Sequence, residues 1–137
     1  MAVYLLDTNV VSEFRRKRPH GAVLAWLAGV PSADLSISAV TVGEIQAGIE
    51  VTRSNDPSKA GEIEDWLIRL VDRYTILPMD SSTFRCWARL MHRQPDHLAE
   101  DAMIAATALV HGLTVVTRNG KDFLPFPVRT HDPFQAA

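Results

Sequence analysis

The sequence predicts an α/β protein with a central parallel sheet of four to five strands and helices on both faces. Short apolar runs alternate along the chain with longer segments in which apolar residues recur at helical spacing, as in parallel sheets. The 137 residues have the usual size of one domain, and a composition of 47% hydrophobic and 22% charged residues is typical of a globular protein. We therefore expect a single domain over residues 1–137.

The first half of the chain opens with a strand and continues with helix patterns. Residues 3–6 form an apolar run that stops at Asp7, which predicts a buried strand followed by a polar turn. A helix is expected over 8–18 and should end there because Pro19 follows, and a residue before proline avoids helical backbone. The other elements expected in this half are a helix over 22–30, a strand over 35–38 and a helix over 39–52.

The second half repeats the alternation. An amphipathic helix is expected over 59–74, where Ile63, Leu67 and Leu70 fall on one side. Residues 98–111 are apolar almost all round, which predicts a buried helix that ends at Gly112. The other elements expected in this half are strands over 75–77, 113–117 and 128–130 and a helix over 81–93.

Charge and cysteine content exclude several classes of protein. A formal charge of −2 argues against a protein that coats nucleic acid by bulk charge. Cys86 is the single cysteine, so no internal disulfide can form and a cytoplasmic location is expected. Because Asp7 interrupts the first apolar run and no stretch reaches the roughly 20 residues of a membrane helix, neither a signal peptide nor a membrane partner is expected.

Four carboxylates stand where a parallel sheet would bring them to one edge. Asp7 and Asp122 follow strands, and Glu44 and Asp101 lie early in helices that begin near the same edge. Ordinary structural explanations also exist. Asp7 can cap a helix, and the helix dipole can stabilise the negative charge of Asp101 in the first turn. Glu44 and Asp122 can simply be solvated.

Several carboxylates at one edge would repel one another and raise some of their own pKa values. A hard divalent cation such as Mg²⁺ or Mn²⁺ relieves this repulsion and prefers oxygen ligands. Such a cation meets phosphate oxygens and can acidify a water molecule, so the set indicates metal-assisted phosphodiester hydrolysis. Thr8 and Asn9, directly after Asp7, can start the helix or orient a metal ligand.

Four segments, taken in order, resemble the PIN-domain family, specifically the VapC/FitB-type ribonuclease toxins of bacterial type II toxin–antitoxin pairs. The segments are LLDTNV at 5–10, SAVTVGE at 38–44, DAMIAATA at 101–108 and TRNGKDF at 117–123. The resemblance implies a three-layer α/β/α sandwich that cleaves RNA with Mg²⁺ or Mn²⁺. It also implies a homodimer and a cognate antitoxin, through which alone the protein would reach operator DNA.

The resemblance also assigns roles to residues. The implied acidic quartet is Asp7, Glu44, Asp101 and Asp122. Asp7, Asp101 and Asp122 would hold the metal, whereas Glu44 would shape the site or orient the attacking water. Thr117 and Asn119 would support the last loop, and Asn119 is the alternative to Asp122 as the fourth site residue.

Basic residues near the expected site have two interpretations. The run Arg15, Arg16, Lys17 and Arg18 can guide RNA phosphates or can be a solvated helix end. Arg118 and Lys121 can contact phosphate or can be ordinary loop residues.

Two other functions are alternatives to the nuclease. A non-catalytic module of the same fold, acting in a DNA-binding repressor complex, is disfavoured because it would not need repelling carboxylates. An aspartate phospho-acceptor domain is disfavoured because it needs an acidic pair after the first strand, where only Asp7 stands.

Overall fold

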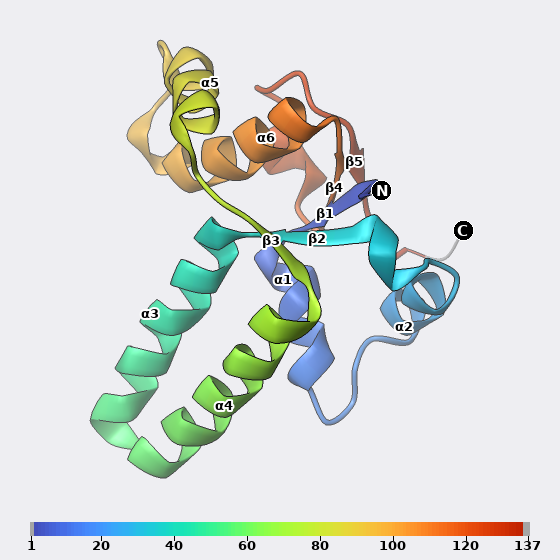
Figure 1. Ribbon diagram of the computed structural model, residues 1–137, viewed down its shortest axis with the longest axis vertical. Helices are drawn as coiled ribbons and strands as arrows, with labels where there is room; N and C mark the ends of the chain where they lie inside the picture. Colours follow the sequence, from blue (N-terminus) through green and yellow to red (C-terminus); the bar gives the residue numbers. More distant parts are fainter. Residues whose placement is uncertain (1, 136–137) are drawn as a thin grey trace.

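The computed structural model describes residues 2–135 and contains a five-stranded parallel sheet with strand order β3-β2-β1-β4-β5 (Figure 1). The strands are β1 (Tyr4–Leu6), β2 (Leu35–Ser38), β3 (Thr75–Leu77), β4 (Thr114–Val116) and β5 (Thr130–His131). In the central register, Leu6 lies opposite both Ile37 and Val116, so three carboxyl ends are level at one edge. The predicted class and strand number are confirmed.

Helices cover both faces of the sheet. They are α1 (Thr8–Val11), α2 (Gly21–Ala28), α3 (Ala39–Asn55), α4 (Pro57–Arg73), α5 (Ser81–Met91) and α6 (Ala99–His111). The short 3-10 helices are η1 (Ser12–Arg15), η2 (Ser32–Asp34), η3 (Asp96–Leu98) and η4 (Gly120–Phe123). Figure 1 shows α5 and α6 on one side of the sheet and the other α-helices on the opposite side. Within residues 2–135, no helix has both the length and the apolar character needed to cross a membrane.

Two cores result from the alternation of side chains along the central strands. Leu6 and Val116 pack into the core shared with α1, α2, α3 and α4. Leu5 and Val115 point the other way, into the core shared with α6 and η4. All four side chains are fully buried, as expected of strands covered on both faces.

The helix predicted over 8–18 is wrong in its second half. Only α1 is α-helical, η1 follows, and the backbone is extended at Arg16. The cause is Glu13, which is 5% exposed and accepts hydrogen bonds from Arg16 Nη1 and the His20 backbone N–H, both at 2.9 Å. These contacts end the helical backbone at Arg16, before the chain reaches Pro19.

Smaller differences concern element ends. The helix expected from residue 59 begins at Pro57, because the side chain of Asp56 accepts a hydrogen bond from the Lys59 N–H at 3.1 Å and proline suits the first turn. α3 continues to Asn55, and the last strand is Thr130–His131 instead of 128–130.

Candidate acidic active site

Asp7 stands at the junction of β1 and α1. Its backbone N–H donates to the Val116 carbonyl at 2.9 Å, which continues the β1–β4 pairing beyond the strand. Its Oδ1 accepts from the Thr8 backbone N–H at 2.8 Å, so the side chain caps α1. Only 8% of the residue is exposed. Asp7 is therefore a helix cap and, at the same time, a carboxylate at the carboxyl edge of the sheet.

Thr117 fixes the second carboxylate oxygen of Asp7. Its buried hydroxyl donates to Oδ2 at 2.8 Å and accepts from the Asn9 amide at 3.3 Å and the Asn119 backbone N–H at 3.0 Å. Asn9 Oδ1 accepts from the Arg118 backbone N–H at 3.2 Å. Burial raises the pKa of Asp7, and the Thr117 hydrogen bond opposes that rise. The network thus joins the loop after β4 to the start of α1.

Glu44 is held on the second turn of α3. The Ser38 hydroxyl caps this helix by accepting from a backbone N–H at 3.1 Å. One turn before Glu44, the buried Thr41 hydroxyl accepts from the Thr8 hydroxyl at 3.1 Å. This contact ties α3 to α1, so the half-buried Glu44 side chain is kept near Asp7.

Asp101 and Asp122 approach from the other core. Asp101 lies in the first turn of α6 and is half-buried. Asp122 lies in η4, directly before Phe123, which is 1% exposed and packs in the core beside α6. This buried phenyl ring anchors the turn, and the charge of Asp122 raises the pKa of Asp101.

The carboxyl groups perturb one another. Burial raises the pKa of Glu44 to about 7, and the charges of Glu100, Asp7 and Asp101 add to this rise. Burial raises the pKa of Asp101 to about 6, with Asp7, Asp122 and Glu100 as the next causes. The structure therefore brings the four predicted acids into one electrostatically coupled group; their catalytic roles stay predictions.

Two members of this site were missed by the sequence analysis. Glu100 is exposed on α6, yet its charge raises the pKa of both Glu44 and Asp101. An acidic pair at the start of an apolar helix is the signal that could have selected it. Thr41, which ties α3 to α1, carries no signal of its own in the sequence.

The donor set fits a hard divalent cation. The coupled side chains are all carboxylates, and oxygen ligands are those that Mg²⁺ and Mn²⁺ prefer. Within residues 2–135, no three acidic, histidine or cysteine side chains lie close enough to hold an ion in this conformation. The carboxylates raise one another's pKa at their present separation, and a bound cation would offset that repulsion.

The predicted basic run lies beside the site, on η1 and the loop after it. Its members, Arg15, Arg16, Lys17 and Arg18, are all exposed. Arg16 pairs with the buried Glu13 at 2.9 Å. Arg15 lines a cavity of about 280 Å³ together with Glu44 and Thr8, which places a cation next to the acidic group.

The other two predicted phosphate contacts flank the exit of β4. Lys121 is exposed in η4. The Arg118 guanidinium lies over the Phe134 ring, 4.5 Å from its centroid. This cation–π contact directs the Arg118 side chain toward Phe134.

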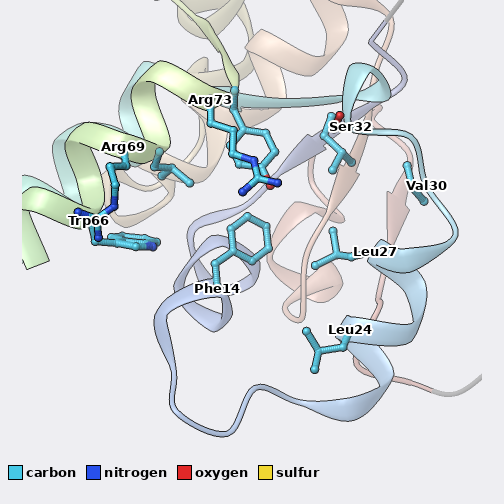
Figure 2. A pocket seen from close by; sticks show the side chains of 11 residues that line it. Phe14, Leu24, Leu27, Val30, Ser32, Trp66, Arg69 and Arg73 are labelled. Atoms are coloured by element: carbon cyan, nitrogen blue, oxygen red, sulfur yellow. The ribbon is translucent and has the colours of Figure 1, made fainter.

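A separate apolar groove of about 600 Å³ lies between α2 and α4. Figure 2 shows Phe14 and Leu27 facing into it and Arg73 reaching over it from α4. The Phe14 and Tyr74 rings stack with centroids 5.8 Å apart. Arg69 contributes a second cation, so the groove is apolar with a basic rim.

Known protein sequences resemble this chain over nearly its whole length. The family model described as PIN domain matches residues 4–125. Toxin FitB of Neisseria gonorrhoeae is 33% identical over 136 residues, which cover 95% of this chain and 97% of that protein. The VapC ribonuclease Y4jK of Sinorhizobium fredii is 32% identical over 143 residues, which cover 97% of this chain and 99% of that protein.

Solved structures show the same fold. FitAcB from Neisseria gonorrhoeae matches with a TM-score of 0.85 at 32% identity, covering 97% of this chain and 99% of that chain. FitAB bound to an IR36 DNA fragment matches with a TM-score of 0.83 at 30% identity, covering 98% of each chain. The resemblance seen in the four sequence segments and the three-layer sandwich it implies are both confirmed. The chain therefore belongs to the PIN domain family, together with FitB and VapC proteins.

Proposed function

We propose that the protein is the toxin of a type II toxin–antitoxin pair and a metal-dependent endoribonuclease. The observation that carries the proposal is the coupled group of Asp7, Glu44, Glu100, Asp101 and Asp122. A fold gains no stability from carboxylates that raise one another's pKa, whereas a site for a cation and a phosphate does need them. The ribonuclease name of a relative supports the same chemistry.

Asp7, Asp101 and Asp122 would hold Mg²⁺ or Mn²⁺. When bound, the cation supplies a Lewis acid that acidifies water and neutralises phosphate charge. Thr117 keeps the Asp7 carboxylate oriented through the 2.8 Å hydrogen bond to Oδ2. Glu44, across the site on α3, would orient the attacking water by accepting a hydrogen bond from it.

Water as the nucleophile determines the products. Attack of water on phosphorus in line with the leaving 3′-oxygen breaks the phosphorus–oxygen bond, and the leaving oxygen takes a proton. The products are a 5′-phosphate and a 3′-hydroxyl. An RNA with 2′,3′-cyclic phosphate ends would instead show attack by the ribose and exclude this proposal.

The Asp101→Asn variant tests the proposal against a matched control. Asp96→Asn removes a carboxylate that is exposed just before α6 and outside the coupled group. We expect Asp101→Asn to lower RNA cleavage by at least about 100-fold, as for other positioned catalytic groups, and Asp96→Asn to leave it unchanged. EDTA should stop cleavage and Mg²⁺ or Mn²⁺ restore it. Cleavage that continues in EDTA would rule out the metal.

An antitoxin is the protein partner that we propose, with the groove between α2 and α4 as its docking site. The groove suits an apolar segment that carries acidic residues, because its floor is apolar and Arg69 and Arg73 lie at its rim. Leu24→Glu, on a groove residue that is 47% exposed, should weaken a complex formed with the antitoxin. Leu124→Glu, at a residue 81% exposed outside the groove, is the control. Equal binding by both variants would place the antitoxin elsewhere.

The alternative is a non-catalytic role inside a DNA-binding complex. One relative, FitAB, was solved bound to DNA, which favours operator binding by the pair. Growth arrest on expression separates the two functions. Asp101→Asn should abolish growth arrest if RNA cleavage causes it, and arrest that persists undiminished would favour the non-catalytic role. The homodimer and the cytoplasmic location stay predictions; sedimentation tests the first.

A further inference from the structure

A third cavity, of about 510 Å³, lies where η1 and the loop after it face α4. We call it the basic groove, and its cationic lining is Arg15, Arg16, Lys17, Lys59 and Arg69. One acidic side chain, Glu62, also lines it. Five positive charges against one negative charge contrast with the formal charge of −2 for the whole chain. Of these cations, only Arg15, Arg16 and Lys17 were predicted from the sequence to contact RNA.

Most of these cations have no partner carboxylate. Within residues 2–135, the ion pairs of basic residues involve only Arg16 and Arg53. Lys59 and Arg69 are exposed on α4, and Arg15 lies over the Trp66 ring, 6.0 Å from its centroid. The groove therefore presents unpaired cations beside an aromatic ring, a combination that binds the phosphates and bases of single-stranded nucleic acid.

The basic groove is continuous with the acidic site. Arg15 and Ile63 line both the basic groove and the 280 Å³ cavity that contains Glu44. A strand whose phosphate reaches the acidic group can thus continue past Arg15 into the basic groove. An acidic protein segment would gain nothing from this continuity, so the geometry favours RNA as the occupant.

We propose that the basic groove binds the RNA strand next to the cleaved phosphodiester, with Lys59 and Arg69 as phosphate-binding residues. This inference rests on the ribonuclease function proposed above. Arg15, which lines both cavities, would contact the strand where it passes from the basic groove to the acidic site. Lys59 and Arg69 touch neither the acidic carboxylates nor the cavity beside Glu44. Their loss therefore changes substrate affinity and raises KM more than it lowers kcat.

The test compares two double variants in an Asp101→Asn background, with EDTA present so that RNA stays intact. Lys59→Gln with Arg69→Gln removes two groove cations, and Arg85→Gln with Arg89→Gln removes two exposed cations on α5, on the other face of the sheet. The probe is a fluorescent oligouridylate whose anisotropy is followed across salt concentrations. Each phosphate contact to single-stranded RNA contributes about 0.7 to the slope of log K against log salt.

We expect the groove pair to lower the salt slope by about 1.4 and to weaken binding about 25-fold near 0.1 M salt, with little change for the α5 pair. Unchanged affinity and slope in the groove pair would overturn the inference. Weaker antitoxin binding by the groove pair does not support the inference, because Arg69 also lies at the rim of the apolar groove proposed for the antitoxin; intact oligouridylate binding overturns the inference whatever the antitoxin does. Because binding is measured without cleavage, failure here is distinct from failure of the proposed nuclease.

Discussion

The Glu44→Gln variant measures how strongly the carboxyl groups of the acidic site repel one another. Burial raises the pKa of Glu44 from its ordinary value of 4.5 to about 7, and Glu100, Asp7 and Asp101 add to the rise. Between these two pH values the folded protein binds a proton that the unfolded chain has released. The stability that this group contributes is therefore lost as the pH rises from about 4.5 to about 7.

The magnitude follows from the pKa of about 7. Unscreened, the difference from 4.5 corresponds to about 3 kcal/mol. Because the side chain is half-buried, water screens the repulsion, and we expect about 1 kcal/mol. For a protein of 137 residues, removing this repulsion by Glu44→Gln should raise Tm by about 3 °C near pH 8 in the absence of metal. Near pH 5 the protonated Glu44 is neutral like glutamine, so the two proteins should melt together.

Thermal unfolding by circular dichroism in EDTA, at about pH 5 and about pH 8, is the assay. Asp65→Asn is the matched control, because it removes an exposed carboxylate on α4 outside the coupled group. A Tm rise of the same size at both pH values would refute the repulsion, since it would come from packing. A lower Tm for Glu44→Gln near pH 8 would refute it as well.

Three further outcomes follow from the same contacts. Mg²⁺ at ten times its dissociation constant should stabilise the wild type by about 1.4 kcal/mol, and a Tm equal to that in EDTA would contradict binding. Thr117→Val should cost about 1–3 kcal/mol in urea unfolding and weaken cleavage, because Asp7 loses a buried donor; unchanged activity would show that this donor is dispensable. Glu13→Gln should lower Tm near pH 7 by removing a charged acceptor of Arg16 and His20, and the difference should shrink in acid.

The strand pattern predicted the acidic site because of one geometric rule. Parallel strands end at a common edge, so Asp7, directly after β1, and Asp122, in the short 3-10 helix η4 that follows β4, were expected to lie near each other there. Asp101 was predictable because its spacing puts it on the same helix face as the apolar Ala105 and Ala108. These inferences need only local sequence and topology.

Contacts that depend on how particular side chains pack were not predictable. The backbone direction after Val11 depends on the hydrogen bond that Glu13 accepts from the His20 N–H. No local sequence pattern predicts that a glutamate will be buried. Lys59 and Arg69 read as a solvated face of an amphipathic helix; they face the basic run only because α4 packs against η1. The exposed Glu100 raises the pKa of Glu44 through its charge, an effect that the spacing of residues in the sequence does not predict.

Glu13 and Asp7 are the two most buried acidic residues, and their pKa values are shifted in opposite directions. Glu13 is buried, yet hydrogen bonds from His20 and Arg16 and the charge of Arg16 outweigh burial, so its pKa lies below the ordinary value. Asp7 is buried with donors on both oxygens, and its pKa is still raised. The fold thus compensates the burial of the Glu13 carboxylate, whereas the pKa of Asp7 stays raised by burial and, to a smaller extent, by the charge of Asp122. Helix capping explains the orientation of Asp7, and a cation bound beside it would lower its pKa again.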